Sequence, residues 1–399
     1  MVFRSSARCL LPLFLCSATF FPVASSSPCL VAYTGTQPQP DGYSNTSLYG
    51  IDPTTAEVTF LVNYNNNGVS TKPTGVQCEQ GFDSRLDVAV VTNAEADGNG
   101  DSAFVVGMAG KMSPAPLLIH DLASNVSFCD GGAGPQFWGL TALPTPKTIS
   151  KSGNRTGSSS DTSQPFAALL SSYDESTGDY NFSIGQITVS ADAKGPAATF
   201  DLKLSWDQDS ADGKAYLGCA QQSPDQEIVG VDKAQQRLYI ACGGRESGQQ
   251  FLVTVDVGSE KWNVVSHTAL PATLSFVHIL GVSNEHHQIV ATAGWGNGTI
   301  GLGHLNTDKM EWEPDMVYYP MVNHGPTFGY DEANDTIYVW DAAPVQSALL
   351  HSSNSDSEVQ SRMGIVSMTT GQIEYVDVKV NVHLRSLVFA EECAAFIEQ

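Results

Sequence analysis

Three histidines stand at similar positions in three consecutive repeats of short apolar segments. His278 precedes ILGVSN, His324 precedes GPTFGYD and His383 precedes LRSLVFAEE, while Glu227 stands before IVGVD in the preceding repeat. Three imidazoles and a carboxylate can bind a divalent transition metal ion or act as general acid and base. The spacing from each histidine to the following turn differs, so the alternative is a set of separate polar residues that bind water.

A second candidate site is the segment Asp97-Gly98-Asn99-Gly100-Asp101, which precedes the apolar run AFVVG. Alternate Asp and Asn side chains place hard oxygen ligands on one side of a tight turn, which suits Ca²⁺. The segment resembles the calcium loops of integrin-type FG-GAP repeats. It departs from them at Ser102, which replaces a glycine, and it lacks the later acidic ligand. The alternative is an ordinary Asp/Asn/Gly hairpin turn.

Local catalytic motifs are missing from the sequence. It contains no GxSxG, HExxH or GxxxxGK motif and no Rossmann glycine set between a strand and a helix. This absence does not exclude catalysis, because a catalytic site can be assembled from residues of several repeats. His286 and His287 fall in a hairpin turn and are expected to be solvent-exposed. Five aromatic residues are expected either to pack between sheets or to form a binding rim: Trp138, Trp295, Trp312, Tyr318 and Tyr319.

Short strands are the elements that must position these residues. Helical periodicity is almost absent, and runs of β-branched, aromatic and aliphatic residues alternate with Gly, Asn, Asp and Ser. The clearest runs are 86–93, 237–244, 251–258, 288–295 and 336–343. The sequence therefore predicts an all-β fold, either a sandwich, a barrel or a propeller.

The strand pattern repeats along the chain. Residues 326–380 form a unit of four antiparallel strands, with an Asp/Asn turn after the first and a Thr-Gly turn before the last. The same order recurs at 227–267 and 277–315, and weaker copies occupy 75–128 and 137–206. This repeat resembles the β-propeller superfamily, especially the YVTN and quinoprotein-like propellers. The resemblance implies a single propeller domain and no specific family.

The two chain ends complete the pattern. Residues 385–399 resemble the first two strands of a unit, and residues 46–63 resemble the last two. Joining these N- and C-terminal strands in one composite blade would hide the exposed sheet edges. The expectation is six blades within residues 28–399, with seven as the alternative. The polar segment 145–165, rich in Ser and Thr, is expected to be a mobile loop.

The N-terminus has the pattern of a secretory signal peptide. Arg4 and Arg8 precede an apolar run at 10–21, and small residues follow it. We expect residues 1–27 to be removed and the protein to be secreted. The apolar run is too short for a transmembrane anchor, and no later stretch is long enough, so no membrane span is predicted.

Cysteines and glycosylation motifs agree with export. Removal of the signal leaves six cysteines, which predicts up to three disulfides among fifteen connectivities. The candidate pairs are Cys29–Cys393, which the joined chain ends would bring together, Cys219–Cys242 and Cys78–Cys129. Six Asn-x-Ser/Thr motifs predict a glycosylated surface: Asn45, Asn125, Asn154, Asn181, Asn297 and Asn334.

The amino-acid composition limits the classes of partner that are expected. The 399-residue chain has 42 acidic and 19 basic residues, a net charge of −23, and 42% hydrophobic residues. Such a chain can bury a large core. Its acidic surface repels phosphate backbones, so no nucleic-acid partner is expected.

These patterns predict a secreted, glycosylated propeller, expected to be a monomer, that binds an extracellular protein or glycan through its rim loops. The alternative is a metal-dependent hydrolase or lyase at the central channel. In that case His278, His324 and His383 would hold a divalent metal ion, with Glu227 as a further ligand or base. A purely structural role is a third reading, which the sequence does not separate from the first.

Overall fold

The computed structural model describes the chain in segments, and every regular element in them is a β-strand. No helix long and apolar enough to cross a membrane occurs in these segments. The described residues are 27–38, 44–63, 80–83, 88–93, 102–107, 117–119, 136–144, 163–174, 179–192, 195–207, 229–243, 250–270, 277–283, 286–296, 298–313, 315–322, 326–341, 361–379 and 384–393.

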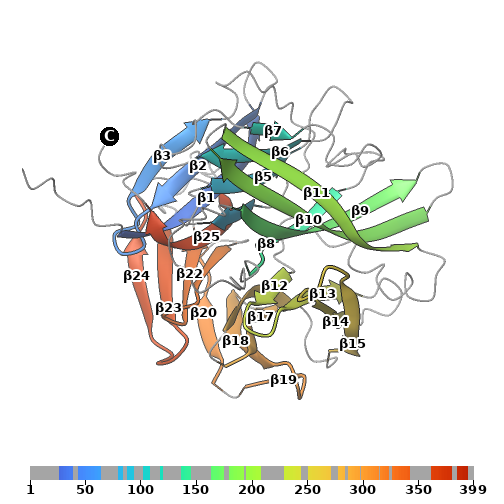
Figure 1. Ribbon diagram of the computed structural model, residues 1–399. Coiled ribbons are helices and arrows are strands. Elements are labelled where there is room, and N and C mark those ends of the chain that lie inside the picture. Colours follow the sequence, from blue (N-terminus) through green and yellow to red (C-terminus); the bar gives the residue numbers. More distant parts are fainter. Residues whose placement is uncertain are drawn as a thin grey trace, which may run out of the picture.

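The described strands form six antiparallel sheets (Figure 1). Sheet 1 contains β25 (Leu384–Cys393), β1 (Ser27–Pro38), β2 (Ser44–Ile51) and β3 (Val58–Asn63). Sheet 2 contains β4 (Gln80–Asp83), β5 (Val88–Asn93), β6 (Ser102–Gly107) and β7 (Leu117–Ile119). Sheet 3 contains β8 (Gln136–Ala142), β9 (Ser163–Asp174), β10 (Asp179–Asp192) and β11 (Gly195–Asp207).

The other three sheets come from the second half of the chain. Sheet 4 contains β12 (Val229–Asp232), β13 (Arg237–Gly243), β14 (Gln250–Asp256) and β15 (Asn263–Ala269). Sheet 5 contains β16 (Val277–Ser283), β17 (Gln288–Gly296), β18 (Thr299–Asn306), β19 (Glu311–Trp312) and β20 (Val317–Pro320). Sheet 6 contains β21 (Thr327–Asp331), β22 (Thr336–Asp341), β23 (Arg362–Ser367) and β24 (Ile373–Asp377).

One edge strand of each sheet lies at the centre of the molecule. Strands β25, β4, β8, β12, β16 and β21 contact one another in that order, and β21 also contacts β25. The sheets therefore stand around a common axis, as Figure 1 shows. This arrangement is a single all-β propeller.

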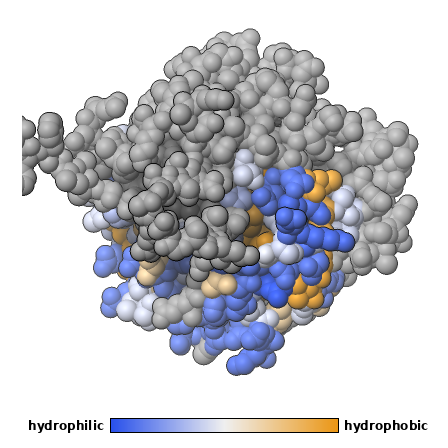
Figure 2. Space-filling view, viewed as in Figure 1, coloured by the Kyte–Doolittle hydropathy of each residue, from blue (hydrophilic) through white to orange (hydrophobic). Residues whose placement is uncertain are grey.

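The core lies between neighbouring sheets. On β13, Leu238 and Ile240 pack toward sheet 3, whereas Tyr239 and Ala241 pack toward sheet 5. Successive side chains of a strand point to opposite faces, so a strand buried on both faces must be apolar throughout. The continuous apolar runs in the sequence follow from this packing. Most of the described surface in Figure 2 is hydrophilic by contrast.

One type of tight turn recurs between strands. In three turns an Asp side chain accepts backbone N–H groups two or three residues later: Asp52 from Thr54, Asp232 from Gln235 and Asp331 from Ala333. The fourth residue after each Asp has a positive φ, 54° at Ala56, 55° at Gln236 and 47° at Asp335. The side-chain cap replaces backbone hydrogen bonds that the turn leaves open.

The chain ends meet in sheet 1, with a different division from the expected one. Strand β25 pairs antiparallel with β1, from Ser27 opposite Cys393 to Thr34 opposite Leu384. The C-terminal segment supplies one strand and the N-terminal segment supplies three, so the expectation of two strands from each end is wrong. Residues 384–393 continue as one strand because no turn residue interrupts them.

Two boundaries also differ from expectation. Residues 163–165 of the expected loop 145–165 belong to β9, where Pro165 lies opposite Thr188 of β10; residues 145–162 lie outside the described residues. The unit expected at 277–315 extends to residue 320 because β20 pairs with the first half of β18. Strand β19 pairs with the other end of β18.

Candidate functional site

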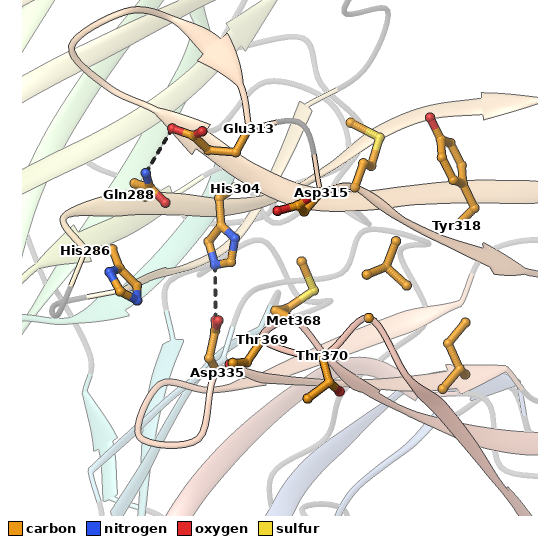
Figure 3. Close-up of a pocket in the computed structure, with 14 residues that line it drawn as sticks. His286, Gln288, His304, Glu313, Asp315, Tyr318, Asp335, Met368, Thr369 and Thr370 are labelled. Carbon is orange, nitrogen blue, oxygen red and sulfur yellow. Dashed lines mark hydrogen bonds and ion pairs between the residues drawn. The ribbon is translucent and has the colours of Figure 1, made fainter.

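A pocket of about 710 Å³ lies between sheets 5 and 6 (Figure 3). Its walls come from strand β18, from the β16–β17 turn, from the segment between β19 and β20, and from two turns of sheet 6. Polar side chains dominate the lining: His286, Gln288, His304, Glu313, Asp315, Asp335, Thr369 and Thr370. Two methionines and the exposed Tyr318 supply apolar surface.

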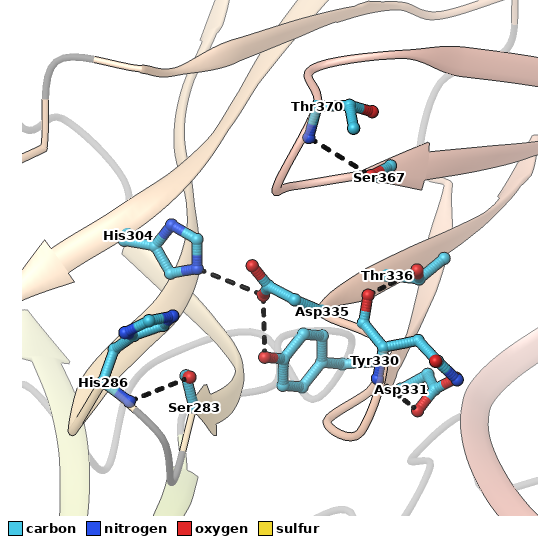
Figure 4. Close-up of polar contacts among 10 residues, drawn as sticks. Ser283, His286, His304, Tyr330, Asp331, Asp335, Thr336, Ser367 and Thr370 are labelled. Atoms are coloured by element: carbon cyan, nitrogen blue, oxygen red, sulfur yellow. Dashed lines mark hydrogen bonds and ion pairs between the residues drawn. The ribbon is translucent and has the colours of Figure 1, made fainter.

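One polar contact joins the two walls of this pocket. His304 Nε2 on sheet 5 lies 3.2 Å from Asp335 Oδ1 on sheet 6. The Tyr330 hydroxyl donates to the same Oδ1 at 3.0 Å (Figure 4). His304 and Asp335 are 15% and 17% exposed, so the contact is shielded from most of the solvent. The pair therefore links two sheets at the surface of a cavity.

Local structure places each member of this group. Asp335 is the positive-φ residue of the β21–β22 turn, a conformation that Asp tolerates better than most residues. Tyr330 on β21 reaches across to sheet 5 over Gly281, where an added Cβ would lie 2.3 Å from the tyrosine ring. The close approach of sheets 5 and 6 at Tyr330 thus requires a glycine at position 281.

The electrostatics keep Asp335 charged. Burial raises the pKa of Asp335, but the hydrogen bond and charge of His304, with the Tyr330 hydroxyl, outweigh this and hold the pKa below its usual value. Burial and the nearby Asp335 charge raise the pKa of Tyr330 far above that of free tyrosine. Tyr330 therefore stays protonated as a donor. Because Asp335 is an ionised acceptor, His304 Nε2 carries the shared hydrogen.

A second carboxylate is fixed on the sheet 5 wall. Glu313 Oε1 accepts from Gln288 Nε2 and from Asn306 Nδ2, each at 3.1 Å. Asp315 is exposed beside it, and Tyr318 is 65% exposed on β20. The pocket thus offers carboxylate, imidazole and hydroxyl groups together with one accessible aromatic ring, which suits a polar ligand with several hydroxyl groups.

A similar histidine–carboxylate pair lies on the other side of sheet 5. His287 Nδ1 lies 2.7 Å from Oδ2 of the fully buried Asp232 on sheet 4. His286 is exposed as expected, and the His287 side chain is still 42% exposed although its ring contacts this buried carboxylate. At the same end of the propeller, Lys233 Nζ lies 3.2 Å from Glu332 Oε2.

The predicted channel cluster is only partly described. His278 lies on the central strand β16 and is buried, and burial lowers the pKa of His278 to about 4. Glu227, His324 and His383 lie outside the described residues, so their convergence stays a prediction. Among the residues that the structure describes, no three His, Cys, Asp or Glu side chains are grouped to hold a metal ion. The candidate calcium ligands Asp97, Asn99 and Asp101 lie outside the described part.

The other predicted sites are described in part. Cys29 on β1 and Cys242 on β13 are buried; Cys393 belongs to β25, and the remaining three cysteines lie outside the described segments. Asn334 is exposed in the β21–β22 turn, and its Nδ2 donates to Asp331 Oδ2 at 2.8 Å. Asn45 and Asn181 lie near the starts of β2 and β10. Asn125, Asn154 and Asn297 are outside the described residues.

The aromatic residues divide between the two expected roles. Tyr319 is fully buried beside Gly364 of sheet 6, whereas its neighbour Tyr318 faces solvent at the pocket. Trp312 packs against the core between sheets 4 and 5. The side chains of Trp138 and Trp295 are outside the described set. Alternation along β20 explains why adjacent tyrosines have opposite environments.

Sequence reasoning missed His304, Asp335, Tyr330 and Glu313. A signal for one of them, Asp335, was present in the repeat Gly-hydrophobic-Asp at 230–232 and 329–331, with Gly281-Val282-Ser283 as a variant. This repeat fixes the turn, and the fourth residue after its last position is His287 in sheet 5 and Asp335 in sheet 6. Aligning those fourth residues would have marked them as equivalent side chains at one end of the ring.

The solved structures that are similar to this chain share little sequence identity with it. No family model matches the chain, and no curated protein matches it. A putative 6-phosphogluconolactonase from Bacteroides uniformis is similar in structure at 8% identity, covering 91% of this chain and 100% of that chain with a TM-score of 0.43. TolB from Acinetobacter baumannii has 8% identity, 91% and 66% coverage and a TM-score of 0.48.

The WD40 domain of Toxoplasma gondii coronin is similar at 11% identity, with 77% and 71% coverage and a TM-score of 0.34. At such identities the likeness extends to the fold alone. The chain is a β-propeller, and no specific family is assigned to it.

Proposed function

We propose that this protein is a secreted, glycosylated propeller that binds a neutral glycan through its rim, at the pocket between sheets 5 and 6. The observation that carries the proposal is the polar lining of that pocket beside the exposed ring of Tyr318. Carboxylates and amides accept and donate hydrogen bonds to sugar hydroxyls, and an aromatic face packs against the apolar face of a sugar ring.

The charges of the pocket favour a neutral ligand over an acidic one. Glu313, Asp315 and Asp335 lie in the lining, and no Lys or Arg occurs among the described lining residues. A uronate, sulfate or phosphate group would meet like charge there. A protein partner with a polar surface is the competing outcome.

We also propose that the six sheets are the six blades of a closed ring, joined at sheet 1. The pairing of β25 with β1 and the cyclic contacts of the central strands support this closure. The candidate disulfides Cys29–Cys393 and Cys219–Cys242 belong to the same proposal; the β1–β25 pairing supports the first, because Cys29 lies opposite Ala390 and Cys393 opposite Ser27. Secretion is supported by the signal-like N-terminus and the glycosylation motifs.

The test uses the full chain expressed in a eukaryotic secretory host. The culture medium is analysed for the cleaved, glycosylated protein by mass spectrometry, before and after removal of N-glycans. The purified protein is then tested against an array of neutral, amino and acidic oligosaccharides. We expect neutral oligosaccharides to bind best.

A matched pair of variants localises the binding. Tyr318→Ala is expected to weaken binding about tenfold, which corresponds to about 1.4 kcal/mol. Leu202→Ala, at an exposed apolar position on β11 of sheet 3, is expected to leave it unchanged. Equal binding by the two variants, or capture of a protein but no glycan, would contradict the proposed glycan site.

A further inference from the structure

We propose that the His304–Asp335 contact is a pH-sensitive latch between sheets 5 and 6, which tightens the rim pocket when the imidazole is protonated. This inference rests on the proposed function, because it concerns regulation of the same pocket. The geometry that carries it is the position of the pair. His304 belongs to one wall and Asp335 to the other, and their 3.2 Å contact spans the cavity (Figure 3).

Protonation changes both the strength and the chemistry of this contact. A neutral His304 gives Asp335 an ordinary hydrogen bond, whereas the imidazolium forms a charge-assisted one. Histidine side chains commonly change charge between about pH 5 and 8. Asp335 stays ionised through that range because its pKa lies below the usual value. When the imidazole is protonated, the contact is therefore stronger, and His304 Nδ1 changes from an acceptor to a donor.

The surrounding groups do not compete for the latch. Asp335 Oδ1 holds His304 and Tyr330 together, while Glu313 is engaged by Gln288 and Asn306 on its own sheet. Among the described residues, no side chain other than Asp335 hydrogen-bonds the His304 ring. The titratable groups that line the pocket with His304 are His286, Glu313, Asp315, Tyr318 and Asp335. Tyr330 donates to Asp335, and Glu332 acts on Tyr330 from the same turn. The β23–β24 turn contributes only uncharged residues to the pocket.

The backbone on both sides makes the contact a link between two rigid parts. Asp335 projects from a tight turn that Asp331 caps, and His304 projects from the paired region of β18, opposite Val290. A stronger bond at the tip of the turn therefore restrains the turn against sheet 5. At acidic pH the pocket walls are held closer to their binding arrangement, so a neutral sugar pays less ordering entropy on binding.

The first test needs no ligand. Hydrogen–deuterium exchange of peptides covering 283–290 and 331–336 is compared at pH 5.5 and pH 8, after correction for intrinsic exchange rates. In the wild type we expect about fivefold slower exchange at pH 5.5, from the difference between a charged and a neutral hydrogen bond. His304→Gln and Asp335→Asn should abolish this difference. His267→Gln, on β15 of sheet 4, should retain it.

Equal corrected exchange in the wild type at both pH values would overturn the latch, as would a difference that persists in Asp335→Asn. If His304→Gln fails to fold, ¹³C NMR titration of histidines in the wild type and in Asp335→Asn replaces it. Loss of the carboxylate must then lower the titration midpoint of one histidine, and an unchanged midpoint would overturn the proposal.

The second test measures binding of cellohexaose, mannohexaose and galactohexaose at the same two pH values. We expect about fivefold tighter binding at pH 5.5 for a hexasaccharide that binds, and no such change in Asp335→Asn. Binding that is equal at both pH values would overturn the regulation. If no hexasaccharide binds but exchange still responds to pH, the glycan proposal fails and the latch stands.

Discussion

Sheet 5 meets its two neighbours through the same pair of residue types, with different consequences. On the sheet 4 side, Asp232 is fully buried, caps its own turn through Gln235 and holds His287 at 2.7 Å. On the sheet 6 side, Asp335 is half-buried and holds His304 at 3.2 Å next to an open pocket. Asp232 caps the turn that contains it. Asp335 caps no turn, because Asp331 caps the turn in which Asp335 lies.

In this fold, Asp232 contributes to the stability of its turn, whereas Asp335 is placed where it can contact a ligand. A carboxylate that satisfies its own backbone cannot be altered without loss of the turn. A carboxylate at the positive-φ position does not cap the turn, so it can contact a ligand or form a pH-sensitive pair. We therefore expect the two pairs to respond differently to substitution.

The largest effect is expected from Asp232→Ala. It removes the cap of the β12–β13 turn and leaves His287 without its buried partner, so the free energy of unfolding should fall by about 3 kcal/mol. Asp335→Ala should cost about 1 kcal/mol, because its turn keeps the Asp331 cap. Urea unfolding at pH 7 measures both. Equal losses would break the distinction between the two sides.

An effect of similar size on the free energy of unfolding is expected from acidification, through His278. This residue lies on β16 of sheet 5, the sheet that contributes to both histidine–carboxylate pairs. Because its folded pKa is lowered from 6.5 to about 4, the unfolded chain takes up the proton first as the pH falls. This contribution to stability is complete above pH 6.5 and is lost between pH 6.5 and 4, by about 3 kcal/mol. Urea unfolding at pH 7 and pH 4.5 measures it.

The matched variants for this effect are His278→Gln, which should reduce the loss on acidification, and the exposed His267→Gln, which should not. The sign is opposite to that of His304, whose contact strengthens on protonation. An undiminished loss in His278→Gln would assign the acid sensitivity to another group.

A smaller effect is expected from Gly281→Ala. The new Cβ would lie 2.3 Å from the Tyr330 ring, so the ring or the sheet must shift, at a cost of about 2 kcal/mol. The shift should also disturb the Tyr330–Asp335 bond on the sheet 6 side and leave the sheet 4 side intact. In a double-mutant cycle, Tyr330→Leu should relieve part of the cost. Strict additivity of the two unfolding free energies would argue against the close contact.

The smallest effect is expected from Tyr330→Phe. The variant keeps the ring in its place over Gly281 and removes only the hydroxyl donor to Asp335, so the loss should be about 1 kcal/mol. Removing this donor should also raise the pKa of Asp335 toward its usual value. That shift can be followed by ¹³C NMR of the Asp carboxylates, and an unchanged midpoint would show that the hydroxyl does not control the carboxylate.

Strands such as β14, β18 and β22 were predictable because they are largely buried on both faces and apolar along their length. The run 336–343 contains Ile337 and Val339, which pack toward sheet 5, and Tyr338 and Trp340, which pack toward sheet 1. Such runs are visible in sequence without any knowledge of their partners. Strand β1 was missed because SPCLVAYTGTQP combines five apolar residues with glycine and prolines, and only its pairing with β2 and β25 makes it a strand.

The pocket was not predictable from local sequence. His304 and Asp335 are 31 residues apart and belong to different sheets, so their meeting depends on how the sheets pack. Glu313 follows a two-residue strand that pairs with only one end of β18. The expectation of clustered histidines came from aligning the starts of central strands, whereas the described cluster formed at the turns.

The fourth residue after the cap of each tight turn is filled differently along the chain, by alanine, glutamine, histidine, methionine, aspartate or glycine at positions 56, 236, 287, 310, 335 and 371. The backbone there keeps its shape whatever the side chain, at a cost of about 1 kcal/mol for a residue other than glycine. These positions therefore accept different side chains without a change in the backbone of the turn. A single substitution at any of them can therefore place a new reactive group at a turn while the strands on either side keep their pairing.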